Sequence, residues 1–221
     1  MRTSVLKVIV LATVSGLASA AAPEVNTQPK AEVAAPSKLP RVVLDARLGG
    51  LFPSLFNSLD TTFTVHAGVA LQFAFARALG VLMDLSYCEP TAAGSRNDPR
   101  LVVNGGDEKW QLAVRDLGVA LGARVQFQLG SLFDGYLGAG PQLSFTRTVT
   151  SAVAGDTALG THTEYSTRIG GLFRAGAGLK VGPGAIVLEL ALTVTPVDHL
   201  ITGDANTSSL SALVGYAFYV R

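Results

Sequence analysis

Three residues spaced two apart are the first candidates for catalysis in this chain. His162, Glu164 and Ser166 would share one face of an extended strand, and Asp198-His199 follow further along. A nucleophile, its base and an orienting acid must lie within hydrogen-bond distance of one another, and no local motif surrounds these residues. We therefore expect no enzyme and no catalytic residue. The alternative is that these residues catalyse a hydrolase or lipid-modifying reaction at the rim of a barrel.

Metal and cofactor chemistry have little support in the sequence. Cys88 is the one cysteine of the chain, so it can form neither an internal disulfide nor a thiolate site with several ligands. The glycine pairs Gly138/Gly140 and Gly176/Gly178 lack the strand-to-helix context of phosphate-binding loops. We expect neither a cofactor nor a metal.

Charged side chains recur at positions that alternate with apolar ones, which predicts that they point into the interior of a barrel. Charges in a narrow interior are costly unless they are paired. We therefore predict a lumen charge network, made up of Asp45, Arg47, Asp84, Arg124, Arg168, Arg174, Lys180 and Glu189.

The spacing also predicts some of the pairs. The tight turn at 182–184 places Glu189 opposite about Ala177, so Glu189 should bridge Arg174, Lys180 or both. Asp84 and Arg124 should lie at similar heights on neighbouring strands and pair. Paired charges would plug the lumen; in the alternative they line a narrow pore, where the excess of basic residues favours anions.

From Arg41 onward, apolar residues recur at every second position, which is typical of β-strands. These strands would position the charges. No position on the apolar face carries a charge, although 15% of the chain is charged. A charge facing lipid costs ~2–4 kcal/mol at the middle of a membrane, whereas a soluble barrel carries its charges outside. The pattern predicts an all-β fold, an eight-stranded antiparallel up-and-down transmembrane β-barrel, with strands at 42–50, 63–75, 81–87, 117–129, 137–146, 168–181, 186–194 and 210–220.

One change of phase interrupts this pattern. Trp110, Leu112 and Val114 alternate oppositely to the strand at 117–129. The switch near Arg115-Asp116 predicts a bulge, or an extension of the strand above the membrane.

The connections alternate in length. Short turns are predicted at 76–80, 130–135 and 182–184, and longer loops at 52–61, 88–109, 150–163 and 195–208. This asymmetry is typical of outer-membrane barrels, whose long loops face outward. Because binding usually occurs on loops carried by a rigid scaffold, the long and charged loop 88–109 is the candidate site for an extracellular ligand; the alternative is a merely solvated loop.

The N-terminal region predicts export. A cationic start, a short apolar stretch and Ala18-Ser19-Ala20 indicate a cleaved signal peptide over 1–20. A Pro/Ala-rich periplasmic linker follows over 21–40 and the barrel domain over 41–221. Since the chain has 17 basic and 16 acidic residues, nucleic acid is not an expected partner.

The chain from Arg41 to Arg221 resembles the small eight-stranded outer-membrane proteins of the OmpA/OmpX kind, by its pattern. The ending Gly215-Tyr216-Ala217-Phe218-Tyr219 resembles the C-terminal signal that the barrel assembly machinery reads in this class, with Tyr216 and Phe218 as its aromatic residues. The resemblance implies a porin-like membrane protein of a Gram-negative bacterium, located in the outer membrane, with outer-membrane lipid and the assembly machinery as partners.

Three functional hypotheses follow. The first is an integral outer-membrane barrel with a structural or interaction role through its surface loops and a lumen plugged by charged side chains. The second is a narrow small-solute channel with a weak preference for anions. The third is a secreted soluble barrel that binds an apolar ligand, against which the sidedness of the charges argues.

Overall fold

The computed structural model describes residues 42–73, 78–100, 103–196 and 206–220. The predicted signal peptide and linker lie outside these residues, as do Asp198-His199. Within the described residues, no helix is long and apolar enough to cross a membrane.

Antiparallel strands form nearly all of the described chain. They are β1 (Val42–Phe52), β2 (Thr62–Gln72), β3 (Leu79–Cys88), β4 (Thr91–Asn97), β5 (Asp107–Gln128), β6 (Phe133–Ala154), β7 (Thr157–Val181), β8 (Gly184–Val194) and β9 (Ser209–Val220). Two single-turn 3-10 helices, Pro53–Leu55 and Val103–Gly106, lie in connections.

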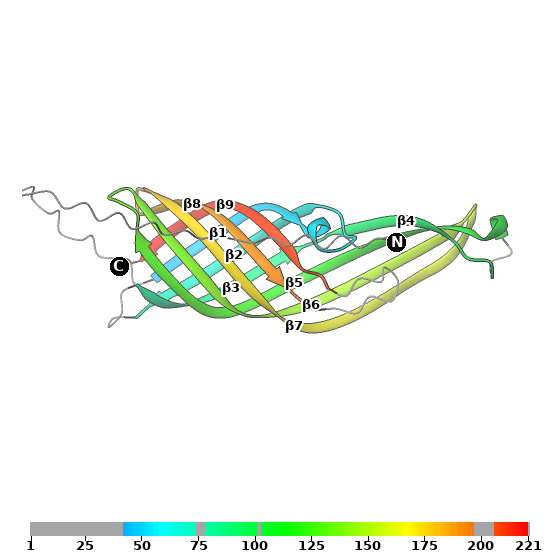
Figure 1. Cartoon of the computed structure of the whole chain (residues 1–221), viewed down its shortest axis with the longest axis horizontal. Coiled ribbons are helices and arrows are strands. Elements are labelled where there is room, and N and C mark those ends of the chain that lie inside the picture. Colours follow the sequence, from blue (N-terminus) through cyan, green and yellow to red (C-terminus); the bar gives the residue numbers. More distant parts are fainter. Residues whose placement is uncertain (1–41, 74–77, 101–102, 197–205, 221) are drawn as a thin grey trace, which may run out of the picture. The chain divides into compact units, whose positions relative to one another are not determined.

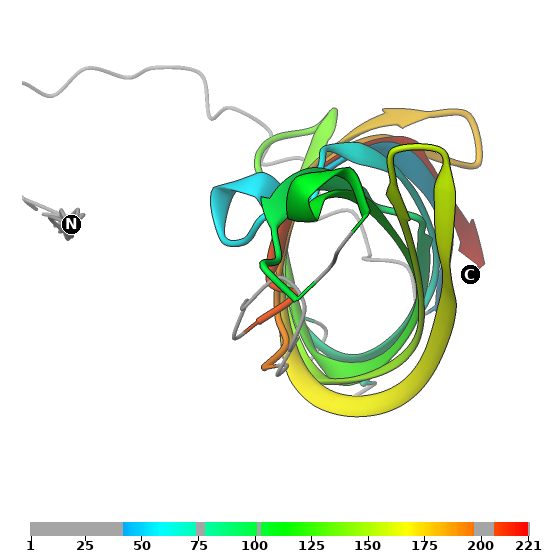
Figure 2. The same ribbon diagram turned by 90° about the vertical axis from the view of Figure 1, so that its right-hand side faces the viewer.

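All of the nine strands except β4 close into a barrel. Each of these eight strands pairs with its neighbours in the order β3-β2-β1-β9-β8-β7-β6-β5, and a β3–β5 pairing completes the circuit. The seam between first and last strands is fully paired, from Val42 opposite Val220 to Phe52 opposite Leu210. Viewed from the end, the strands enclose a closed oval (Figure 2). The predicted eight-stranded up-and-down barrel is therefore confirmed.

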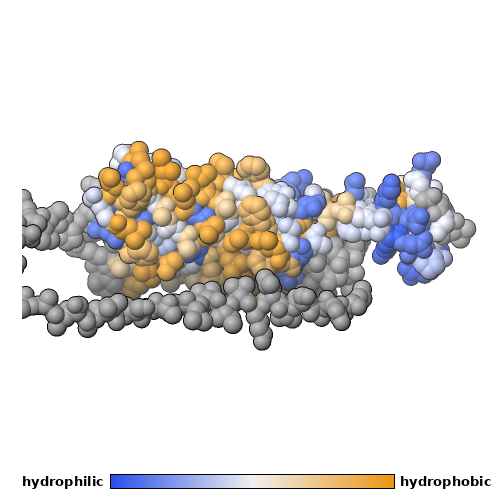
Figure 3. All heavy atoms as spheres, turned by 45° about the horizontal axis from the view of Figure 1, so that its top comes forward, coloured by the Kyte–Doolittle hydropathy of each residue, from blue (hydrophilic) through white to orange (hydrophobic). Residues whose placement is uncertain are grey.

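Alternation places apolar side chains on the outside of this barrel. The outward positions of the strands carry large exposed side chains, among them Phe63, Met83, Leu121, Ile169 and Leu188. In the space-filling view the hydrophobic side chains cover the barrel, and the hydrophilic ones gather at the far end of the strands (Figure 3). This arrangement is the reverse of a soluble barrel, which buries its apolar groups inside.

Four strands rise beyond the barrel at one end (Figure 1). We call this part the extension; it consists of β4 with residues 107–115 of β5, 147–154 of β6 and 157–165 of β7. The predicted long loop at 150–163 is therefore wrong, because a β-hairpin with a tight turn at Gly155-Asp156 occupies it. The loop predicted at 88–109 likewise contains β4, which pairs with β5.

The change of phase near Arg115-Asp116 marks the start of the extension and not a bulge. The β5–β6 register runs without a shift from Lys109 opposite Val153 to Ala120 opposite Gln142. Leu112 and Val114 keep facing the same side as the lumen residues and form an apolar cluster with Leu59 and Ala92, against which Trp110 packs. Above the barrel the apolar face is thus the inner one.

Candidate functional site

Arg47 of β1 is the centre of a group of charges in the lumen. Its guanidinium is fully buried and forms ion pairs with Asp84 of β3 and Glu189 of β8. Because β1 is paired to β2 and β9, these contacts reach past its neighbouring strands and cross the lumen. The guanidinium also lies 2.8 Å from Asp45 Oδ1 on its own strand.

A second arginine completes a closed arrangement. Arg174 Nη1 of β7 donates to Asp84 Oδ2 at 2.8 Å, and its Nε and Nη2 donate to Glu189 Oε2 at 3.0 and 2.8 Å. Each carboxylate is therefore bound by both arginines. We call Arg47, Asp84, Arg174 and Glu189 the ion-pair quartet; its four members come from β1, β3, β7 and β8.

Neutral and charged neighbours add further contacts to the quartet, although the buried Nε of Arg47 has no hydrogen-bond partner among the described residues. His66 Nδ1 lies 2.9 Å from Asp84 Oδ1, and the Tyr136 hydroxyl donates to Glu189. Arg124 lies 4.1 Å from the centre of the Tyr136 ring and 4.0 Å from Asp45. Three arginines thus face three carboxylates, which leaves the cluster without net charge when His66 is neutral.

Apolar layers bound the cluster on both sides along the lumen. Toward the short turns lie Val43, Ala70, Leu82, Ala185, Val187 and Ala217, packed with Tyr136. Toward the extension lie Ala120, Leu172, Ala191 and Leu213. Because the side chains of the quartet are buried, their ion pairs are poorly screened by water and their loss is costly.

Glycines make the room that the cluster needs. A Cβ on Gly176 would lie 2.4 Å from the Tyr136 ring, and one on Gly68 would lie 2.5 Å from Asp45 Oδ1. A larger residue at either position would displace a member of the cluster.

The other predicted lumen charges lie elsewhere. Lys180 pairs with Asp134 at 3.0 Å, near the short turns, and not with Glu189. Arg168 is half-buried on the inner side of β7, opposite Ser144, and within the described part of the chain it forms no ion pair. The expected Asp84–Arg124 pair is wrong, because Asp84 is taken by the quartet and Arg124 lies beside Asp45 and Tyr136.

The expected register of Glu189 is wrong by one residue. Glu189 stands opposite Gly176 and not Ala177, because Lys180 pairs with Ala185 across a tight turn in which Gly182 has a φ of +60°. Sequence reasoning also missed Tyr136 and Asp134. Both are in phase with Gly138, which the sequence predicts to point inward. Continuing the same alternation toward the N-terminus, from Gly138 to Tyr136 and then to Asp134, would have included both residues.

Above the cluster the lumen continues as a small polar chamber. Hydroxyl groups dominate its wall, with His66, Asp116 and Gln142, while Leu51, Pro53, Leu59, Pro90 and Val114 lie among its other lining residues. The free space is about 30 Å³, roughly the volume of one water molecule.

The tip of the extension is polar and held by its own contacts. Arg96 pairs with Glu108, and Asn97 donates to Asp107 at 2.7 Å. The Arg100 side chain and backbone donate to Asp98 and hold the pKa of that carboxyl below its usual range. The described residues of the region 88–109 therefore lie largely in strands and a 3-10 helix, and the Arg100 side chain at the tip is 85% exposed.

Among the described residues, β4 and the upper part of β7 are the two edge strands of the extension. The β7–β8 pairing begins at Gly171 opposite Val194, so residues 157–170 of β7 have no described strand on that side. Most of their side chains are exposed. An unpaired strand edge offers backbone donors and acceptors to another chain.

The candidate catalytic residues lie on this part of β7. His162, Glu164 and Ser166 stand opposite Thr150, Thr148 and Thr146 and share one face, as the spacing predicted. His162 and Glu164 are exposed and Ser166 is half-buried, and no hydrogen bond joins these three side chains to one another in the described part of the chain. Among the residues with described placement, no cluster of three metal-ligating side chains exists.

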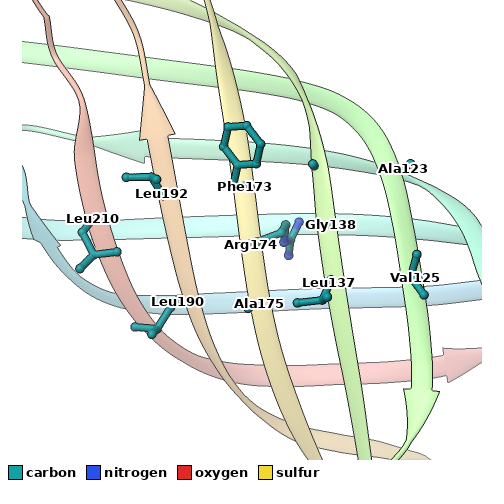
Figure 4. A pocket seen from close by; sticks show the side chains of 11 residues that line it. Ala123, Val125, Leu137, Gly138, Phe173, Arg174, Ala175, Leu190, Leu192 and Leu210 are labelled. Atoms are coloured by element: carbon teal, nitrogen blue, oxygen red, sulfur yellow. The ribbon is translucent and has the colours of Figure 1, made fainter. Parts of the chain in front are cut away.

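A shallow hollow indents the outer wall of the barrel. Ala139 and Ala175 leave a depression bordered by larger apolar side chains (Figure 4). Phe173, Leu190 and Leu210 lie around it, from three successive strands. Apart from Arg174, whose guanidinium belongs to the ion-pair quartet, the lining is apolar or glycine and suits hydrocarbon chains.

Tyr216 and Phe218 of β9 point outward and are exposed. The Tyr216 hydroxyl donates to the Val181 carbonyl at 2.9 Å. The final residue, Arg221, lies outside the described residues.

Comparisons with known proteins find a likeness of fold. No protein-family model and no curated protein matches the sequence. Among solved structures, Neisserial surface protein A is 17% identical, with 81% of this chain and 96% of that one covered and a TM-score of 0.44. Ail, the attachment invasion locus protein of Yersinia pestis, is 10% identical (80% and 95% covered, TM-score 0.40), and the N-terminal β-barrel domain of Pseudomonas aeruginosa OprF is 11% identical (82% and 98% covered, TM-score 0.43).

Proposed function

We propose that this protein is an integral barrel of the bacterial outer membrane that does not conduct and that presents its extension as an interaction surface outside the cell. The membrane location is supported by the outward apolar side chains, because exposed apolar area on this scale needs lipid. The interaction role is supported by the extension, since its strands continue past the apolar wall and leave the β7 edge unpaired.

The ion-pair quartet is the main observation that supports the proposal that the lumen is closed. Its members reach across the barrel from four strands and bond to one another, and apolar layers cover both sides. An eight-stranded barrel is just wide enough for side chains to fill its interior. A narrow channel would need these bonds to break.

Fractionation tests the membrane location. The full chain should remain with the outer membrane and should run faster on a gel unboiled than boiled. Recovery in the soluble periplasmic fraction would contradict the location.

Single-channel recording in a planar lipid bilayer tests the closed lumen. The wild-type protein should show no sustained conductance, and the double variant Arg47→Ser, Arg174→Ser, which removes both arginines of the quartet, should conduct. Arg100→Ser, an exposed arginine of the extension, is the matched control. Steady conductance by the wild type would make the protein a channel.

Shortening the extension tests the interaction role. Joining Thr150 to His162 through Asn-Gly removes residues 151–161 and leaves the barrel pairs intact. Cells that display the shortened protein should adhere to other cells less than cells that display the full-length protein, while heat modifiability is unchanged. Equal binding by both forms would contradict the role.

A further inference from the structure

Two arginines face each other on the outer wall at the base of the extension. Arg115 of β5 and Arg147 of β6 are register partners, and Tyr165 of β7 is the next residue across. All three are on the outward side, in phase with Leu117 and Phe145. We call Arg115, Arg147 and Tyr165 the boundary row.

The boundary row lies where the apolar wall ends. The next outward row toward the short turns contains Leu117 and Phe145, which are partners of each other and are both exposed. The next row toward the tip contains Ala113, Val149 and Thr163. Aromatic and basic side chains are typical of the interface between hydrocarbon and headgroups, so this is the height at which lipid headgroups meet the wall.

The two positive charges are only partly compensated by the protein. Like charges directly opposite each other on neighbouring strands are destabilising, and Cβ atoms at such positions are about 5 Å apart. Glu89 lies 3.0 Å from Arg115 Nε and also accepts from the Tyr87 hydroxyl. One carboxylate thus faces two arginines.

Arg147 in particular has unused hydrogen-bonding capacity. Its guanidinium lies 5.8 Å from the centre of the Tyr165 ring, which orients it. Its Nε is buried and has no hydrogen-bond partner among the described residues. A planar guanidinium is suited to bidentate binding of a phosphate, here through the two Nη groups, since the Nε is buried.

From this geometry we propose that Arg115 and Arg147 form a binding site for the phosphate group of a membrane lipid in the leaflet on the side of the extension. The phosphate would bridge the two guanidiniums and supply the negative charge that the row lacks. Tyr165, with 73% of its surface exposed, would pack beside the lipid. This inference rests on the proposed membrane location.

Native mass spectrometry of the full chain in phosphate-free maltoside detergent tests the site. Titrated with dioleoyl phosphatidic acid, the wild-type protein should retain one lipid, and Arg115→Gln with Arg147→Gln should weaken that binding about tenfold or more, because the double variant removes the charge-assisted hydrogen bonds of both guanidiniums. Arg147→Lys should give an intermediate loss, since it keeps the charge but not the planar fork.

Controls separate this site from general attraction of charge and from free phosphate. Arg100→Gln removes one charge from the exposed tip of the extension and should leave lipid binding unchanged. Inorganic phosphate at millimolar concentration should not displace the lipid, because the apolar wall holds the acyl chains. An equal loss with Arg100→Gln, no loss in the double variant, or displacement by inorganic phosphate would overturn the proposal.

Heat modifiability of each variant is measured in parallel. Folded variants that insert into dioleoyl phosphatidylcholine vesicles but bind phosphatidic acid like the wild type would refute the lipid site alone. Failure of the wild type to insert would refute the membrane location instead.

Discussion

At the scale of single residues, the lumen shows how far an ion pair can be predicted from spacing. The inward direction of Arg47, Arg174 and Glu189 follows from alternation alone, because a charge is excluded from the lipid face. The partners do not follow, since they depend on which strands lie across the lumen. Asp84 illustrates this: its neighbour-strand partner was expected to be Arg124, yet it bonds to residues of β1 and β7.

Removing one arginine of the quartet should be severely destabilising. Arg47→Met leaves two buried carboxylates with Arg174 alone, and an uncompensated buried charge costs about 3–5 kcal/mol. Urea unfolding in lipid vesicles, followed by tryptophan fluorescence, measures the change. The exposed Arg100→Met should change the free energy of unfolding by less than about 0.5 kcal/mol; similar losses for both variants would contradict the role of the quartet.

Two glycines of β7 provide a matched pair. Gly176→Ala places a Cβ 2.4 Å from the Tyr136 ring, whereas Gly171→Ala meets its nearest atom, on Phe173, at 3.5 Å. The first should destabilise by about 1–3 kcal/mol through overpacking, and the second should have little effect. The free energies of unfolding of the two variants are compared from their urea unfolding curves. Equal values would mean that Tyr136 can be displaced without loss of stability.

At the scale of elements, the sequence predicts the barrel strands well and the extension poorly. Within the barrel one face contacts lipid and the other the lumen, so the alternation is strong. In the extension both faces of β7 are largely exposed to water, and Thr157 to Thr167 consequently carry polar residues on both sides. Such a stretch has the composition of a loop, although its backbone is paired along β6.

A charge on the wall distinguishes a membrane barrel from a soluble one. Leu188 is 65% exposed in the middle of β8, and Leu188→Arg should destabilise the protein in vesicles by ~2–4 kcal/mol. Thr161→Arg, on the exposed part of β7, should have almost no effect. If Leu188→Arg were equally harmless, the wall would not face lipid.

At the scale of the whole molecule, the barrel and the extension should respond differently to protease. Arg96 and Arg100 have side chains that are 55% and 85% exposed, whereas Arg47, Arg124 and Arg174 of the barrel are buried. Trypsin added to intact cells should cut within 96–100 and leave the barrel uncut in the membrane. Mass spectrometry of the fragments identifies the sites, and protection of 96–100 until the cells are lysed would place the extension on the periplasmic side.

The strands that contribute the four quartet residues bear on the order in which the barrel assembles. Its residues belong to strands from both ends of the barrel sequence, so all four can meet only after β1 has joined β9. Until that seam closes, Arg47 and Glu189 lack each other and would enter the hydrocarbon as separate charges. The four charges are therefore paired with one another in the closed barrel, and inserting the strands before closure would cost the free energy of burying them unpaired.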